Sequence, residues 1–188
     1  AFEEVKPNLI LTVPLILEKI YKKMILPQLS KTTMKVALNI PLLDSRIYAQ
    51  IRKKLVDAFG GRFREVIVGG AAMNEEVTNF LYKIKFPFTI GYGMTECGPL
   101  ISYDHNDEYV PGSCGQILKG IMKVRIDSED PYNKVGEIQV SGENVMKGYY
   151  KNEEATSKVF TEDGWLRTGD LGTIDADNRI YIRGRSKT

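Results

Sequence analysis

One stretch, residues 65–96, constrains the fold more than any other part of the chain. Two short strands rich in β-branched and aromatic residues, over 65–68 and 88–90, flank a helix that Asn74 is expected to cap. A strand–helix–strand unit of this length predicts a right-handed crossover between parallel strands. Each strand runs into a glycine-containing loop, so both loops should leave the same carboxyl edge of one sheet. Open α/β folds bind ligands at that edge.

The chain before this stretch continues the alternation of strand and helix. Hydrophobic periodicity predicts a strand over 9–13, an amphipathic helix over 15–26 that ends before Pro27, and a second helix over 46–59. Together with the crossover unit, these elements predict an α/β subdomain fragment over residues 1–102.

After about residue 102 the pattern changes to the period-two alternation of half-buried strands. Strands are predicted over 122–127, 137–141 and 179–183, with turn signals between them. They indicate a small antiparallel sheet or distorted barrel over 103–183. The predicted fold class is therefore α/β, a parallel-sheet subdomain followed by an antiparallel β-barrel-like subdomain.

Composition excludes several classes of protein. With 26 basic and 24 acidic residues, the net charge of +2 argues against a nucleic-acid partner. The chain contains no apolar run of about 18 residues that could span a membrane, and its start does not resemble a signal peptide. Cys97 and Cys114 are too few for a disulfide framework, so a cytoplasmic location is expected. The single histidine, His105, disfavours a histidine metal site or a Ser-His-Asp hydrolase.

The sharpest local signal lies in the second glycine loop, over 91–96. Gly91 and Gly93 let the backbone approach a ligand, and the side chain of Tyr92 offers a flat face. Thr95 offers a hydroxyl, and Glu96 is a hard oxygen ligand suited to Mg²⁺ carried by a nucleotide. An ordinary strand-to-loop turn with a surface glutamate has the same composition, and the residues alone leave both interpretations open.

Three weaker signals accompany this loop. The small residues over 69–72 suit either a ligand edge or close helix–strand packing. Asp170, which we expect in a tight turn, either accepts two hydrogen bonds from a vicinal diol or only caps that turn. Arg185 and Lys187 flank a serine and either attract ribose or phosphate oxygens or form a solvated basic segment.

Five motifs follow one another along the chain: GAA at 70–72, GYGMTE at 91–96, GEIQVSG at 136–142, GWLRTGDLG at 164–172 and GRSK at 184–187. In this order and spacing they resemble the adenylate-forming enzymes, which include acyl-CoA synthetases, luciferases and nonribosomal adenylation domains. The segments KPNLILTVPLILEKIYKKM and IRKKLVDAFGGRFREVIVGGAAM are similar to the long-chain fatty acyl-CoA synthetase branch of that superfamily.

The resemblance implies an enzyme that uses ATP and Mg²⁺ to convert a long-chain fatty acid to an acyl-adenylate, with release of pyrophosphate. Coenzyme A then takes the acyl group and AMP leaves. Within the family the alternatives are another acid (aryl, short-chain or amino acid) and loading onto a carrier protein. Outside it they are a nucleotide-binding regulatory module and a non-enzymatic domain. Peripheral membrane association and the oligomeric state stay open.

The same resemblance implies that the adenine pocket and its loop are formed by Gly70, Ala71, Ala72, Gly91, Tyr92 and Gly93. Tyr92 would stack on the base, Thr95 would bind the α-phosphate and Glu96 would hold Mg²⁺. Thr95 and Glu96 are thus the implied catalytic residues.

Asp170 and Arg185 would bind the ribose, and Lys187 matches the family's hinge, here residues 184–188. The family's Ser/Thr/Gly-rich phosphate loop and its lysine-bearing C-terminal domain have no counterpart in these 188 residues. We therefore expect the chain to be a central piece of a longer enzyme and to be inactive alone.

Overall fold

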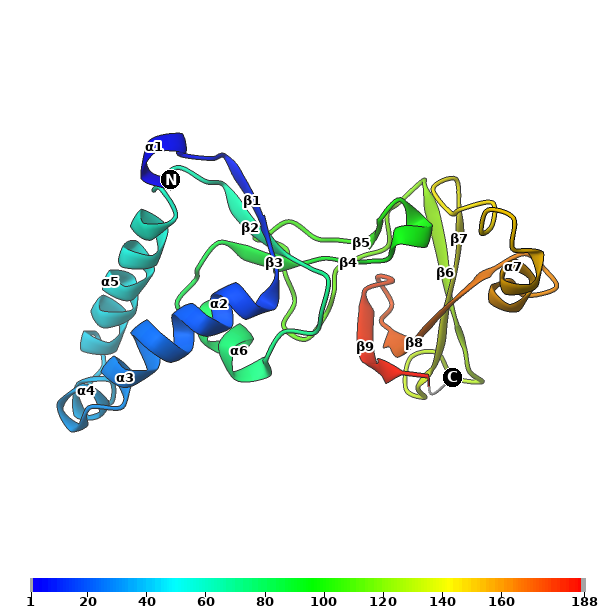
Figure 1. The fold of residues 1–188 in the computed structure, drawn as a ribbon. Helices are drawn as coiled ribbons and strands as arrows, with labels where there is room; N and C mark the ends of the chain where they lie inside the picture. The colour runs from blue at the N-terminus through cyan, green and yellow to red at the C-terminus, as the bar shows by residue number, and fades with distance from the viewer. Residues whose placement is uncertain (1, 187–188) are drawn as a thin grey trace. The chain divides into compact units, whose positions relative to one another are not determined.

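The computed structural model describes residues 2–186 and divides into two compact units, Ala1–Thr89 and Ile90–Thr188 (Figure 1). The division falls ahead of the boundary at residue 102 that the sequence predicts. The reason is packing, because Tyr92 and Ile101 are buried in the hydrophobic core of the second unit.

A three-stranded sheet forms the centre of the first unit. Its strands are β1 (Leu9–Thr12), β2 (Glu65–Val68) and β3 (Phe88–Ile90), in that order, and β1 pairs with β2 in parallel. Val66 is fully buried and Phe88 is 2% exposed. Successive residues of β2 and β3 are buried, as in strands covered on both faces, whereas β1 alternates and exposes Leu9 and Leu11. The predicted strands over 9–13, 65–68 and 88–90 are therefore confirmed.

The first long helical segment continues past its predicted end. It consists of α2 (Pro14–Ile20), a π-helical turn (Tyr21–Ile25) and α3 (Leu26–Leu29). The prediction that it ends before Pro27 is wrong. The Leu26 amide donates to the Tyr21 carbonyl, a wider i→i+5 turn that precedes the proline. Pro27 then falls in the first turn of α3, where its missing N–H is not needed.

The other helices of this unit are α1 (Phe2–Val5), α4 (Thr32–Ala37), α5 (Leu43–Ala58) and α6 (Glu75–Lys83). Helix α5 corresponds to the predicted helix over 46–59 and buries Leu55 and its C-terminal neighbour Phe59. Helix α6 begins as expected, since the side chain of Asn74 accepts a hydrogen bond from the Val77 amide at 3.2 Å.

The second unit contains a four-stranded antiparallel sheet in sequential order, β6 (Met122–Asp127), β7 (Gly136–Gly142), β8 (Leu166–Ile174) and β9 (Ile180–Arg185) (Figure 1). Ile138, Val140, Leu166 and Ile180 are fully buried and form its core. The three predicted strands are confirmed. Strand β8 contains most of the GWLRTGDLG motif, for which the sequence predicted a tight turn.

A short hairpin, β4 (Tyr92–Gly93) and β5 (Leu100–Ser102), completes this unit together with α7 (Glu153–Val159). Isolated bridges pair Gln116 with Arg179 and Ile117 with Ser102, so the pairing continues beyond β9 to β5. These bridges extend the backbone pairing of the second unit beyond its four-stranded sheet. Within residues 2–186, no helix has the length and apolarity to cross a membrane.

Candidate functional site

A tyrosine–aspartate hydrogen bond joins the two most distinctive motifs of the second unit. Tyr92 on β4 donates its hydroxyl to Oδ2 of Asp170 on β8 at 2.7 Å. The tyrosine is only 7% exposed. Burial, followed by the hydrogen bond to Asp170 and the charge of that carboxylate, raises the pKa of Tyr92 well above its ordinary value, and a side-chain hydrogen bond with Thr168 partly offsets this rise. Tyr92 is therefore a neutral hydrogen-bond donor at every physiological pH.

Asp170 has a second partner in Arg185, whose Nε lies 3.0 Å from Oδ1. The aspartate side chain is 16% exposed and the arginine side chain 77% exposed. Because solvent screens an exposed guanidinium, this ion pair adds little to stability. A carboxylate has about four lone-pair positions, so both oxygens of Asp170 can still accept further hydrogen bonds.

The position of Asp170 differs from the sequence prediction. It lies inside a nine-residue strand and not at a tight turn. The strand is irregular at this point, since its pairing with β7 shifts register and Gly169 has φ of +71°. The glycine signals that predicted a turn therefore belong to a bulge.

Thr95 and Glu96 lie in a single 3₁₀ turn, Thr95–Cys97, which connects β4 to β5. The Cys97 amide donates to the Met94 carbonyl at 2.9 Å and closes the start of this turn. The side chain of Thr95 is exposed, whereas Glu96 is half-buried. Both groups are therefore held by a well-defined backbone beside Tyr92.

Cys97 is a packed thiol. It is fully buried in the core of the second unit. Burial, followed by the nearby Glu96 charge, raises the pKa of Cys97 to about 11. At neutral pH almost none of it is the reactive thiolate, so it is not a nucleophile.

Glu96 is held by a residue to which the sequence analysis assigned no role. Tyr149 donates its hydroxyl to Oε1 of Glu96 at 2.8 Å, and this hydrogen bond is the main cause of the raised pKa of Tyr149. The Tyr149 amide is fixed in turn by the Thr156 hydroxyl at 2.9 Å. The Met146 amide also donates to the Glu96 carbonyl at 2.7 Å. An aromatic residue directly after Gly148 was the available signal, but nothing local distinguishes it from its exposed neighbour Tyr150.

Position 93 must be glycine because the backbone at Pro99 lies too close to leave room for a side chain. A Cβ atom at this position would lie 2.1 Å from the Pro99 carbonyl oxygen. From the sequence alone, this glycine is expected to let a ligand approach the backbone. The structure shows that the facing strand of the β4–β5 hairpin occupies the space.

Of the remaining predicted residues, Gly91 directly precedes β4, and the others lie in the first unit or outside the described residues. Gly70, Ala71 and Ala72 follow β2 in the first unit, where they are exposed. Their place in an adenine pocket stays a prediction, as does the stacking of Tyr92 on the base. Lys187 lies outside the described residues.

Between residues 2 and 186, no group of three or more histidine, cysteine, aspartate or glutamate side chains could hold a metal ion. Mg²⁺ needs only one or two protein carboxylates when a nucleotide supplies phosphate oxygens. A single carboxylate such as that of Glu96 can meet this need only when phosphate oxygens complete the coordination.

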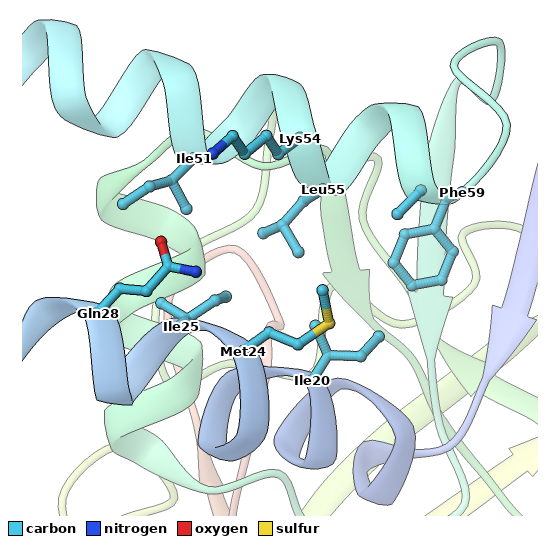
Figure 2. Close-up of a pocket in the computed structure, with 9 residues that line it drawn as sticks. Ile20, Met24, Ile25, Gln28, Ile51, Lys54, Leu55 and Phe59 are labelled. Atoms are coloured by element: carbon cyan, nitrogen blue, oxygen red, sulfur yellow. The ribbon is translucent and has the colours of Figure 1, made fainter.

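The first unit has an apolar pocket between the α2–α3 segment and α5 (Figure 2). Its lining comprises Ile20, Met24, Ile25, Gln28, Ile51, Lys54, Leu55, Ala58 and Phe59. The volume is about 90 Å³, whereas pockets for small ligands measure roughly 300–1,000 Å³. We interpret it as a packing gap between two helices.

A family model described as AMP-binding enzyme matches residues 1–150, most of the chain. The chain belongs to this family. It is 36% identical to 4-coumarate-CoA ligase 1 of Narcissus pseudonarcissus over 78% of its length. It is 30% identical to long-chain-fatty-acid–CoA ligase 1 of Saccharomyces cerevisiae over 98% of its length. The chain spans 29% of the length of each of these relatives.

Solved structures with ATP or AMP bound have a similar fold. The crystal structure of ATP-bound MatB from Rhodopseudomonas palustris matches 96% of this chain with a TM-score of 0.69 and 26% identity. The chain covers 31% of that structure. A malonyl-CoA ligase with methylmalonyl-CoA and AMP bound also matches 96% of this chain, with a TM-score of 0.67.

We predict that Gly93→Ala destabilises the second unit. The new methyl group would force the Pro99 carbonyl away and open the hairpin that carries Thr95 and Glu96, at a cost of roughly 3 kcal/mol, the upper end for overpacking. Thermal unfolding of the full-length protein measures this cost. The control is Gly112→Ala. An added Cβ at Gly112 would meet no neighbouring atom, so the only cost of this substitution is the strain of the positive φ. Equal stability of the Gly93→Ala and Gly112→Ala variants would contradict the prediction.

Proposed function

We propose that the protein is an AMP-forming acid–CoA ligase. The observation that carries the proposal is the hydrogen-bonded set of Tyr92, Asp170 and Arg185 beside the Thr95–Glu96 turn, in a chain of the AMP-binding family. In the first half-reaction an acid carboxylate attacks the α-phosphorus of ATP. The bond from that phosphorus to the bridging oxygen breaks and pyrophosphate leaves. In the second, the coenzyme A sulfur attacks the acyl carbon and AMP leaves.

Asp170 is the group we assign to the ribose. Its carboxylate is fixed from one side by Tyr92 and keeps free lone pairs for two hydroxyl donors. Arg185, whose side chain is largely exposed and whose ion pair with Asp170 is screened by solvent, can turn from Asp170 toward ribose oxygens at little cost. A ribose held at this point fixes the position of the α-phosphate, which is the main requirement for an in-line displacement.

Thr95 and Glu96 are the groups we assign to the phosphate and to its Mg²⁺. The exposed hydroxyl of Thr95 can donate to an α-phosphate oxygen. Tyr149 occupies Oε1 of Glu96 and orients the carboxylate, so that the other oxygen can coordinate the metal. The metal enters with ATP and neutralises charge that develops on the phosphates in the transition state.

A long-chain fatty acid is the substrate we propose. The support is the similarity of residues 6–24 and 51–73 to the long-chain branch, together with the match of the yeast long-chain ligase along 98% of the chain. The specific alternative is an aryl acid, since 4-coumarate ligases share up to 39% identity over shorter regions.

Pyrophosphate release by the full-length protein tests both the reaction and the substrate. With ATP, Mg²⁺ and coenzyme A present, we expect release to depend on the acid and kcat/KM to be at least roughly tenfold higher for long-chain fatty acids than for 4-coumarate or malonate. The control omits the acid. A preference for 4-coumarate would replace the proposed substrate, and no release with any acid would refute the ligase.

Glu96→Gln should slow adenylation by about 10²–10³-fold, the usual cost of one lost transition-state stabiliser. Glutamine keeps the acceptor for Tyr149 and removes only the charge that binds Mg²⁺. The effect should be largest at limiting Mg²⁺, measured as single-turnover formation of acyl-adenylate. Glu162→Gln, which removes an exposed carboxylate of the same unit, is the matched control. Wild-type rates in the Glu96 variant would remove Glu96 from the metal site.

Asp170→Ala should weaken ATP use by roughly ten- to a hundredfold, because hydrogen bonds to a charged group contribute about 1.5–3 kcal/mol. The change should appear in the KM for ATP and leave the KM for the acid nearly unchanged. Asp107→Ala, in an exposed loop of the same unit, controls for the loss of one negative charge. Equal KM values for ATP in the two variants would contradict a ribose contact at Asp170.

A further inference from the structure

Strand β8 forms a bulge at Asp170, where it has two more residues than the facing segment of β7. On either side of this point Glu137 pairs with Leu171 and Gln139 pairs with Arg167. Ile138 on β7 therefore faces three residues of β8, namely 168–170. A bulge of this size interrupts the ladder and leaves buried backbone groups without their regular partners.

The side chain of Thr168 supplies the missing partners. Its hydroxyl donates to the Ile138 carbonyl at 2.7 Å and accepts the Asp170 amide at 3.1 Å. The residue is 4% exposed. Because threonine is stiff about χ1, one buried hydroxyl fixes the backbone on both sides of the bulge.

The other contacts of the bulge hold the intervening glycine. The Gly169 amide donates to the Glu137 carboxylate at 3.3 Å, and its carbonyl accepts the Ser186 amide at 2.8 Å. The positive φ of Gly169 then turns the chain so that Asp170 faces the Tyr92 hydroxyl. Thr168 directly precedes Gly169, and its side chain connects the bulge in β8 to the backbone of β7.

We propose that Thr168 is a positioning residue for nucleotide binding, acting through Asp170: its hydroxyl holds the β8 bulge in the form that presents the Asp170 carboxylate to the ribose. The inference rests on the proposed function for the role of Asp170. A threonine that only filled the core would stabilise the sheet without affecting ATP selectively.

The test compares Thr168→Val, which keeps the shape and removes the hydroxyl, with Thr168→Ser, which keeps the hydroxyl. In the full-length protein we expect Thr168→Val to raise the KM for ATP roughly two- to tenfold, the effect of one hydrogen bond. The KM for the acid should stay unchanged and Thr168→Ser should restore the wild-type KM for ATP. Thr173→Val, the same change at a buried threonine of the same strand, should leave the KM for ATP at its wild-type value.

A double-mutant cycle separates the inference from the function on which it rests. If Thr168 acts through Asp170, Thr168→Val has no further effect on the KM for ATP once Asp170→Ala is present. The positioning role alone would be overturned if Asp170→Ala changed the KM for ATP and Thr168→Val did not. It would also be overturned if the effects of the two substitutions on this KM were fully additive. No effect of Asp170→Ala would refute the ribose assignment instead.

A structural measurement keeps the inference testable without activity. A crystal structure of the Thr168→Val protein should show the bulge rearranged and the Asp170–Tyr92 hydrogen bond lost. Retention of that contact within hydrogen-bond distance would overturn the proposal whatever the kinetics. If the valine variant does not fold, Thr168→Ala also removes the hydroxyl and is measured in the same way.

Discussion

The second unit depends on the pairing of β7 with a strand on each side. Six registered pairs join it to β6, and its pairing with β8 is regular except opposite Ile138. A strand buried this deeply must have its backbone groups hydrogen-bonded, since an unpaired buried carbonyl costs about 1–3 kcal/mol. The interruption at Ile138 is therefore tolerated only because a side-chain hydroxyl takes the place of the missing amide. Asp170, the residue that we propose for ribose binding, lies next to this interruption.

The two carboxylates of the candidate site are held in the same way. A phenol donates to Asp170 at 2.7 Å, and another phenol donates to Glu96 at 2.8 Å. A neutral donor fixes a carboxylate without cancelling its charge, whereas a buried lysine or arginine would neutralise it. The cation that does contact Asp170, Arg185, is mostly in solvent and is screened. The carboxylates consequently remain free to attract Mg²⁺ and sugar hydroxyl groups.

The residues of this chain indicate nucleotide binding more clearly than they indicate which acid is the substrate. The motifs that suit a nucleotide are short and, apart from residues 70–72, lie in the second unit, and family membership agrees with them. The relatives and solved structures that match this chain are named for coumarate, long-chain fatty acids and malonyl-CoA. Selectivity for an acid follows from the shape of an apolar cavity, to which many side chains each contribute little.

Local patterns in the sequence determined the strands β1 to β3, β6, β7 and β9 and the cap at Asn74, because side-chain periodicity and capping involve only near neighbours. They also located the turn of Thr95 and Glu96. The continuation of the helix through Pro27 depends on a local π-helical turn that the sequence pattern did not indicate. Tertiary structure alone decided that Asp170 lies in a strand and that Gly93 faces Pro99. It likewise decided the roles of Tyr149 and Thr168, whose partners lie 53 and 30 residues away. Such contacts exist only when distant segments pair, so no local signal could predict them.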